Sequence, residues 1–573
     1  MLRFLAAPLA LFGLTACQTA APVQTTDVQP AVAQPAFVGA VSAADVRAEA
    51  AGMAMLERGG SATDAAIAIM LALTVVEPQS SGIGGGGFLV RGAADGMVLS
   101  YDGRETAPAG ATPDWFRAPD GSLPSFGESV RSGLSVGVPG NVRLAALAHG
   151  EHGTLPWPDL FQPAIALAQN GFTVNPRLNT SLASATDRAA LTAEGRALYF
   201  DGDVPKSVGS TITNPSLAAT LRRIAAGGAQ AFYTGDSAAA LASTVADATP
   251  RAGSMTPADV SGYAAKARDP VCGLYRAHRV CGMGPPTSGG IAVLQILGQL
   301  ERFDLAALGA KDPRTWHLFL ESQRLAYADR ELYAADMDFQ AVPVAGLLDP
   351  AYLAKRSALI DPARALSNVA AGRPAGAPLA PADGDEPAEH GTSHFAVVGA
   401  DGTMVSYTST IEGAFGSGLM HGGFFLNNEL TDFSRAAEVD GRLVANRVEG
   451  GKRPRSSMSP MVVYDPAGAP LLVIGAAGGG TIPVQTARSI VGVIDFGMTA
   501  DEALAMPFIM AFGSRVFLEK GTWLEEAQGA FEALGHSETI IRDGSLKANA
   551  ILRQGDRWVT ARDPRLAQQI ALP

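Results

Sequence analysis

The stretch at residues 389–432, EHGTSHFAVVGADGTMVSYTSTIEGAFGSGLMHGGFFLNNELTD, is where the sequence changes character. Upstream, residues 370–391 are rich in Pro, Gly and acidic side chains, a composition typical of an exposed loop. An apolar run with β-forming residues follows from His394 to Val398, and Asp401-Gly402 predicts a hairpin turn after which the chain runs back. Thr392 is therefore predicted at the junction of a flexible linker and a rigid strand.

A threonine at this junction has a possible chemical use. A Thr hydroxyl is a weak nucleophile unless a base lies beside it, and the α-amine of an N-terminal Thr can be that base. An α-amine titrates near ~7.7–8.0, against ~10.4 for a Lys side chain, so much of it is basic at neutral pH. Cleavage of the Gly391-Thr392 bond would expose this amine, and Gly391 tolerates the strained backbone that such cleavage needs. Taken alone, Thr392 is better explained as the start of a strand.

Composition narrows the class of protein. The chain has 573 residues, which is long enough for two or more ordinary domains or for one large α/β unit with a deep core. With 47% hydrophobic and 17% charged residues, its composition is that of a soluble globular protein. The formal charge of −12, from 43 basic and 55 acidic residues, argues against nucleic acid or an anionic lipid surface as a partner. The most apolar internal segment, residues 62–76, is too short to cross a bilayer and contains Asp64, so we expect a buried helix there.

The N-terminus has the features of a targeting segment. Arg3 precedes an apolar region at residues 4–14, and Cys17 follows small residues in the sequence Leu-Thr-Ala-Cys. This resembles a bacterial lipoprotein signal at residues 1–17, in which Cys17 becomes lipidated; a plain secretory signal is the alternative. Residues 18–39 are predicted to be a flexible tether. We therefore expect the protein on the periplasmic side of a bacterial membrane, with membrane contact only through a lipid anchor.

Two further cysteines, Cys272 and Cys281, flank two short predicted strands that turn at Arg276-Ala277. This arrangement places them opposite one another, so a disulfide and two buried free thiols are both compatible with the sequence. The chain contains no Cys-x-x-Cys or Cys/His metal-binding spacing, and we expect neither a metal nor a cofactor.

The chain on either side of Thr392 differs in its predicted structure. Residues 40–365 are expected to be mostly helices around a few strands, whereas the part after Thr392 is rich in strands. A Gly-rich turn at residues 475–480 presents backbone N–H groups that could bind an oxyanion, or is a tight turn without a ligand. Arg104 is either a fork-shaped donor for a carboxylate or a surface charge.

Ten short motifs occur in the order found in one known family. They are RGGSATDAAIA, EPQSSGIGGGGF, DGRETAP, VGVPG, PPTSGG, GTSHF, FLNNELTDF, GKRPRSSMSP, AAGGG and DPR at Asp563–Arg565. From about residue 40 onward the chain thus resembles the γ-glutamyltranspeptidase family. The resemblance implies an N-terminal-nucleophile hydrolase fold, a four-layer αββα sandwich. It also implies self-cleavage into a large subunit, residues 40–391, and a small subunit, residues 392–573, which pair with each other.

The resemblance also implies roles for individual residues. Thr392 corresponds to the nucleophile that performs self-cleavage, and Thr410 to an assisting hydroxyl. Simple pairing about Asp401-Gly402 would place Thr410 opposite Ser393, so the role of Thr410 requires a bulge or a slipped register. The remaining correspondences are Gly478 and Gly479 for the oxyanion hole, Arg104, Ser456 and Ser457 for a glutamyl α-carboxylate, and Glu412, Glu429 and Asp432 for its α-amine.

Three positions depart from the pattern of the family. Glu412 stands where many members have Asn, and Glu429 where some have Gln, so the amine pocket is more acidic. This should favour a zwitterionic glutamyl substrate over a glutaryl amide, which lacks the amine. Gly480 replaces a more usual Ser beside the predicted oxyanion hole.

The function implied is that of a γ-glutamyltranspeptidase and glutathione hydrolase without a metal or cofactor. Thr392 would attack the γ-glutamyl amide of glutathione or a related small molecule and pass the γ-glutamyl group to water or to an amino acid or peptide amine. The alternatives are a glutaryl or cephalosporin-type acylase of the same superfamily, and an inactive lipoprotein that binds γ-glutamyl peptides.

Overall fold

The hairpin that begins at Thr392 lies inside a six-stranded antiparallel sheet. In the computed structural model, which describes residues 37–379, 382–384 and 391–572, the hairpin consists of β11 (Ser393–Gly399) and β12 (Met404–Thr410). Strand β1 pairs with β11, and β2 pairs with β12. The order of the sheet is β1-β11-β12-β2-β3-β8, and its other strands are Gly39–Ser42 (β1), Gly86–Gly92 (β2), Val98–Asp102 (β3) and Lys266–Arg268 (β8).

A second six-stranded antiparallel sheet faces the first. Its order is β23-β22-β18-β17-β10-β9. Its strands are Val271–Tyr275 (β9), His278–Gly282 (β10), Met461–Tyr464 (β17), Pro470–Ala477 (β18), Lys547–Gln554 (β22) and Arg557–Arg562 (β23). Strand β11 packs against β18 and β22, so the two sheets meet face to face.

Strand β11 is buried on both of its faces, which explains its continuous apolar sequence. Side chains alternate across a strand. Phe395 and Val397 belong to the core cluster that contains the helix Ala62–Val76 (α2), whereas Ala396 and Val398 belong to the cluster that fills the space between the sheets. A strand between a helical layer and another sheet has no solvent-facing side, which suits the apolar run from Phe395 to Val398.

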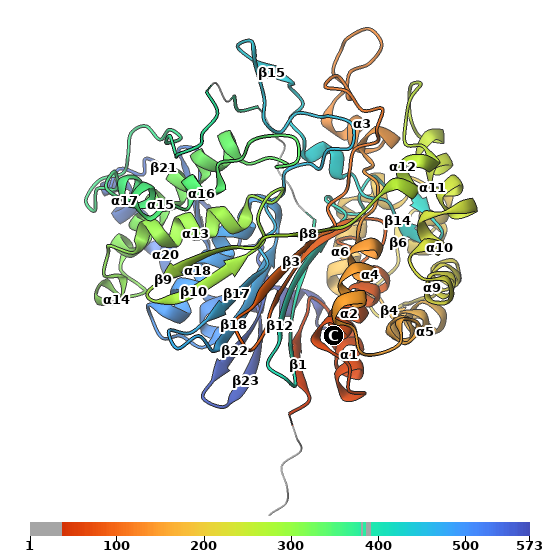
Figure 1. The fold of residues 1–573 in the computed structure, drawn as a ribbon, viewed down its shortest axis with the longest axis horizontal. Helices are drawn as coiled ribbons and strands as arrows, with labels where there is room; N and C mark the ends of the chain where they lie inside the picture. The colour runs from red at the N-terminus through yellow and green to blue at the C-terminus, as the bar shows by residue number, and fades with distance from the viewer. Residues whose placement is uncertain (1–36, 380–381, 385–390, 573) are drawn as a thin grey trace, which may run out of the picture. The chain divides into compact units, whose positions relative to one another are not determined.

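Helices cover the outer face of each sheet (Figure 1). Helix α2, opened by the capping box of Ser61 and Asp64, is buried along its whole length and packs on β11 and β12. The other helices of this layer include Val46–Glu57 (α1), Asn141–His152 (α4) and Gln162–Asn170 (α5); the opposite layer includes Gly289–Leu300 (α13), Pro313–Tyr333 (α15) and Ile482–Ile494 (α18). The layers therefore follow the order αββα, and the predicted fold class is confirmed.

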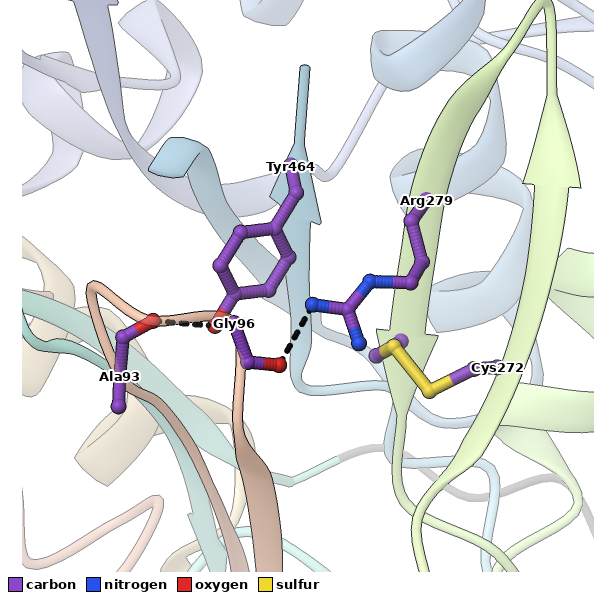
Figure 2. Close-up of a disulfide and its surroundings, with 6 residues drawn as sticks. Ala93, Gly96, Cys272, Arg279 and Tyr464 are labelled. Atoms are coloured by element: carbon purple, nitrogen blue, oxygen red, sulfur yellow. Dashed lines mark hydrogen bonds between the residues drawn. A yellow bond between two sulfur atoms is a disulfide. The ribbon is translucent and has the colours of Figure 1, made fainter. Parts of the chain in front are cut away.

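The two cysteines lie on adjacent strands of the second sheet, as the sequence predicts. Cys272 on β9 is the register partner of Cys281 on β10, and their sulfur atoms form a disulfide. Beside it, Arg279 donates from Nη2 to the carbonyl oxygen of Gly96 at 2.6 Å, and the Tyr464 hydroxyl donates to the Ala93 carbonyl oxygen at 2.9 Å (Figure 2). These contacts join β10 and β17 to the loop between β2 and β3.

Smaller elements extend from the sandwich. A third sheet, with parallel and antiparallel pairing, contains Ile509–Phe512 (β19), Arg515–Glu519 (β20) and Glu538–Arg542 (β21). Longer helices outside the two layers include Pro176–Ser184 (α6), Pro215–Gly227 (α9), Gly235–Asp247 (α11) and Pro350–Ser357 (α17).

The chain from Val38 onward forms one compact unit. The predicted signal segment and Cys17 lie outside the described residues. Within the described part of the chain, the structure contains no helix of the length and apolar character needed to cross a membrane.

Candidate active site

The register of the β11–β12 hairpin places Thr410 beside Thr392. Ser393 pairs with Ser409 and Val398 with Met404, one residue out of step with simple pairing about Asp401-Gly402. The shift arises because the loop has three residues, with Gly402 at a positive φ of 79°. The Gly399 amide donates to the Thr403 carbonyl oxygen at 2.8 Å and closes this loop. A shift by one residue exchanges the faces of a strand, so the slipped register that Thr410 requires is confirmed.

Thr392 and Thr410 share a hydrogen bond at the end of the hairpin. The Thr392 hydroxyl donates to Thr410 Oγ1 at 3.2 Å, and the same Oγ1 accepts from the Glu412 amide at 2.8 Å. Both threonines are buried, with 4% and 2% of their surfaces exposed. A hydroxyl that donates to a fixed acceptor has its lone pairs directed elsewhere, which suits attack on a carbonyl carbon.

The backbone at the predicted cleavage site is crowded and strained. Thr392 has a φ of 125°, a region that β-branched residues rarely adopt. A Cβ atom added to Gly391 would lie 1.7 Å from the Glu412 carbonyl oxygen, so the close approach of these segments requires glycine at position 391. The Thr392 amide donates to the Ser80 carbonyl oxygen at 3.1 Å, which also fixes its nitrogen.

A buried ionic network supports this junction, and the sequence interpretation missed it. Ser393 Oγ donates to Glu77 at 2.8 Å, and Arg177 Nε lies 2.8 Å from the other carboxylate oxygen of Glu77. Arg177 also donates to Ser80 Oγ at 2.9 Å. The motif EPQSS contains Glu77 and Ser80, but no spacing in the sequence indicates their partners.

The predicted oxyanion loop follows the central strand of the second sheet. Gly478 and Gly479 come directly after β18 and have positive φ angles of 121° and 58°. Thr481 Oγ1 donates to the Gly478 carbonyl oxygen at 2.8 Å, and Gln485 Nε2 donates to the Ala477 carbonyl oxygen at 2.9 Å. Because these bonds engage the carbonyl groups, the turn is held in one conformation, as a preorganised anion site requires.

Arg104, Glu429 and Asp432 form a buried ionic cluster that we call the arginine pocket. Arg104 follows β3, and the two acids lie in a short 3-10 helix, Glu429–Asp432 (η3). One guanidinium nitrogen of Arg104 binds Glu429, and the other lies 2.5 Å from Asp432 Oδ2. The guanidinium also donates to the carbonyl oxygens of Pro454 and Arg455. The structure therefore brings together the predicted carboxylate-binding cation and two of the predicted amine-binding acids.

Glu105, next to Arg104, does not neutralise the positive charge of the Arg104 guanidinium at neutral pH. Burial raises the pKa of the Glu105 carboxyl to about 8. Within the described residues, neither of its carboxylate oxygens has a hydrogen-bond partner. The positive charge of Arg104 is therefore left to Glu429 and Asp432.

Glu412, the third predicted amine ligand, borders a separate cavity. Asn428 Nδ2 donates to the Glu412 carboxylate. The φ of Glu412 is 71°, which reflects the tight turn after β12. Glu412 lines a cavity of about 170 Å³ together with Arg131 and Arg188. Burial lowers the pKa of the Arg188 guanidinium, and the nearby Glu412 carboxylate partly opposes this lowering.

Ser456 and Ser457 are held by the loop that contains PPTSGG. The Ser288 amide and hydroxyl both donate to the Ser456 carbonyl oxygen, at 2.8 and 2.7 Å. Arg330 of α15 donates to Ser288 Oγ at 2.8 Å and to Ser457 Oγ at 2.6 Å. Sequence reasoning assigned no role to Ser288 or Arg330, although PPTSGG was among the motifs that indicated the family.

One group of side chains in the described part of the chain has metal-binding chemistry. Ligand atoms of His317, Glu321 and His536 lie within 4.8 Å of one another. However, the two imidazoles hydrogen-bond to each other at 2.8 Å, and the Glu321 carboxylate accepts from Arg324 and from the Leu366 amide. These contacts satisfy the cluster without an ion.

The sandwich and the position of Thr392 define the class of protein. The structure matches the crystal structure of cephalosporin acylase from Bacillus halodurans with a TM-score of 0.78 and 25% identity, over 95% of this chain and 98% of that chain. Two antiparallel sheets between helical layers, with a buried threonine at the start of an inner strand, are the architecture of N-terminal-nucleophile hydrolases, and the protein is an enzyme of this class.

Sequence comparisons identify the family. The family model "Gamma-glutamyltranspeptidase" matches residues 48–572. The glutathione hydrolase proenzyme of Bacillus subtilis (strain 168) is 37% identical over 486 residues, covering 82% of this chain and 80% of that protein. The acylase ACY 1 proenzyme of Pseudomonas sp. (strain V22) is 35% identical over 525 residues, covering 90% and 89%. The chain belongs to the γ-glutamyltranspeptidase family.

Proposed function

We propose that this enzyme is a γ-glutamyltransferase and glutathione hydrolase whose nucleophile is Thr392. The Thr392 oxygen attacks the γ-carbonyl carbon of a γ-glutamyl amide, and its proton passes to the α-amine of the same residue. Gly478 and Gly479 would stabilise the negative carbonyl oxygen. The amine leaves with a proton, and the γ-glutamyl ester on Thr392 is then attacked by water or by another amine.

The α-amine of Thr392 would be released by self-cleavage. The Thr392 hydroxyl attacks the Gly391 carbonyl carbon, the acyl group moves from nitrogen to oxygen, and water hydrolyses the ester. The positive φ of Thr392 and the tight contact between Gly391 and Glu412 support this step, because breaking the bond relieves both. The products are a large subunit, residues 40–391, and a small subunit, residues 392–573.

The ion pairs of the arginine pocket are the observation that supports a γ-glutamyl group as the substrate. In the structure Arg104 binds Glu429 and Asp432. A substrate α-carboxylate can take the place of these acids on Arg104, with Ser456 and Ser457 as further donors. The α-ammonium group can then bind the acids that have been released. A zwitterion therefore leaves no charge of this pocket unpaired, which favours a γ-glutamyl group such as that of glutathione.

A glutaryl or cephalosporin-type acylase is the second candidate, because acylases are among the relatives and structural neighbours. A glutaryl group has a carboxylate but no amine. Its binding to Arg104 would displace Glu429 and Asp432 from the guanidinium and offer them no ammonium group in exchange, which is unfavourable for buried acids. The acidic pocket therefore disfavours this function.

The N-terminal sequence supports a location on the periplasmic side of a bacterial membrane. The charged start, apolar segment and Cys17 are those of a lipoprotein signal. We propose that the protein is held there through lipid on Cys17, where it meets small γ-glutamyl compounds and amino acid or peptide acceptors.

A comparison of wild-type protein with Thr392→Ala tests the mechanism. On a denaturing gel, wild type should give two fragments and Thr392→Ala a single precursor, because alanine has no hydroxyl to attack Gly391. Thr392→Ser, which keeps a hydroxyl, is the matched control and should still be cleaved. Wild type should also release glutamate from glutathione.

Two results would contradict the proposal. An intact wild-type chain with activity that survives Thr392→Ala would exclude Thr392 as the nucleophile. Two fragments that release no glutamate would instead support the γ-glutamyl-binding lipoprotein considered above.

A further inference from the structure

A cavity of about 540 Å³ begins at the predicted oxyanion loop, and the three residues of the arginine pocket do not line it. Gly478 and Gly480 form one end of it, and α15 contributes Tyr327, whose hydroxyl donates to the Gly480 carbonyl oxygen at 2.5 Å. Lys547, at the start of β22, also lines it. We call this space the lysine cavity. Its contact with Gly478 means that a molecule in it would reach the reacting carbonyl group.

Lys547 is attached firmly to the oxyanion loop. On the sheet it is the register partner of Ala477, the residue before Gly478. Its backbone amide donates at 3.1 Å to Gln485 Oε1, and the amide nitrogen of the same glutamine binds the Ala477 carbonyl oxygen. The position of Lys547 relative to the glycine turn is therefore set by strand pairing and by a shared side chain.

The ammonium group of Lys547 has no ion pair within the described residues. Glu77 attracts it and Arg177 repels it, but the Glu77 carboxylate is already bound by Arg177 and Ser393. Lys547 is thus not needed to neutralise Glu77. A half-buried cation without a carboxylate, on the wall of a cavity, is suited to an anionic ligand.

The rest of the cavity wall combines apolar surface with further positive charge. Phe508 and Phe517 from the third sheet provide apolar surface, and the Arg542 guanidinium carbon lies 4.0 Å from the centre of the Phe517 ring. Arg515 also lines the wall, with Asp543 opposing these charges. The remaining charged wall residues are Arg330, Arg455 and Glu331, and the two arginines both bind the glutamate. This wall suits a carboxylate attached to an apolar or aromatic group.

We propose that the lysine cavity holds the amine partner of the reaction and that Lys547 binds the free carboxylate of an amino acid or short peptide there. This inference rests on the proposed function, in which the γ-glutamyl group occupies the arginine pocket. The amine that leaves and the amine that enters bond to the same carbonyl carbon, so both occupy the side that the γ-glutamyl group leaves open.

The transfer step balances with the groups already named. The neutral acceptor amine attacks the ester carbonyl carbon, so a C–N bond forms and the C–O bond to Thr392 breaks. One proton of the amine passes through the Thr392 α-amine to the Thr392 oxygen. The products are a new γ-glutamyl amide and the free threonine hydroxyl.

A pair of acceptors that differ in one group tests the proposal. The dipeptide Phe-Gly carries a carboxylate, and its C-terminal amide does not. With a γ-glutamyl anilide as donor, we expect wild type to use the acid at least ~10-fold better than the amide in acceptor kcat/KM, and Lys547→Met to lose this preference. Lys547→Arg should restore part of it. Lys355→Met, which changes an exposed lysine on α17, is the matched control and should keep it.

Calorimetry separates failure of this inference from failure of the proposed function. The dissociation constants of the acid and the amide are measured on cleaved wild type and on Lys547→Met, without a donor. Tighter binding of the acid that depends on Lys547 supports the cavity assignment even if no γ-glutamyl donor is used. Equal affinity for acid and amide, or a preference that survives in a folded and cleaved Lys547→Met, overturns it.

Discussion

The arginine pocket and the lysine cavity differ in how their charges are balanced. Arg104 is buried and bound to Glu429 and Asp432, whereas Lys547 has no ion pair within the described residues. The first site can accept a ligand only by exchanging ion pairs that it already has. The second can accept an anion without giving up a partner.

Under the proposed function, this difference would make the enzyme strict toward its donor and tolerant toward its acceptor. Exchange in the arginine pocket requires a carboxylate and an ammonium in a fixed arrangement, because any other ligand leaves a buried charge unpaired. Binding in the lysine cavity requires only a carboxylate, and the apolar surface of the cavity can contact varied side chains.

Arg104→Lys should have the largest effect. A lysine cannot bind Glu429 and Asp432 with two separate nitrogens, so the pocket loses its geometry while keeping its charge. We expect kcat/KM for a γ-glutamyl anilide to fall by ~10²–10³, since breaking a buried ion pair typically costs about 3–5 kcal/mol. Arg314→Lys, at an exposed pair with Asp312, is the control and should change it little. An equally active Arg104→Lys would show that the pocket does not bind the donor.

Asp432→Ala should reduce selectivity rather than all activity. The variant removes one acid that we expect to bind the substrate ammonium, so the γ-glutamyl anilide should lose more than the glutaryl anilide. We expect the ratio of their kcat/KM values to fall by ~10-fold or more. Asp203→Ala, at an exposed pair with Arg196, serves as the control. A ratio that does not change would favour the acylase function.

The pH dependence of acceptor use should separate the two sites. Burial is the main cause that lowers the pKa of the Lys547 ammonium to about 7, whereas an arginine stays charged. A carboxylate binds the charged form, so above pH 7 binding requires uptake of a proton and weakens. The acceptor kcat/KM of wild type divided by that of Lys547→Met should fall from ~10 at pH 6 towards 1 at pH 9. This ratio cancels the titration of the acceptor amine and of Thr392, and a constant ratio would contradict the assignment.

The β11–β12 hairpin shows which structural features could be predicted from local sequence. The apolar run from His394 and the turn at Asp401-Gly402 indicated two antiparallel strands with Thr392 at their start, and both strands are present. The face of Thr410 could not be read from them, because a loop of two residues and a loop of three residues share the same turn signal. The three-residue loop was the form that brought the two hydroxyls together.

The partners of the buried charged side chains could not be predicted from the sequence. The adjacent sequence does not indicate whether a charged side chain forms an ion pair. This holds for Arg104, Glu77 and Lys547 alike. Arg104 meets Glu429 after a gap of 325 residues, and Ser393 meets Glu77 after 316. The motif PPTSGG was visible, but its contact with Ser456 depends on the packing of α15 beside it.

The amino-acid sequence by itself determined the family, the αββα class and the place of Thr392 at the start of a hairpin, because these depend on motif order, hydrophobic periodicity and turn residues that are local along the chain. The tertiary structure alone decided which hydroxyl faces Thr392, which acids neutralise Arg104, and that Lys547 stands without a carboxylate beside the glycine turn. These features depend on side chains that meet across the two sheets, where register and burial, rather than neighbouring residues, set each distance and each charge state.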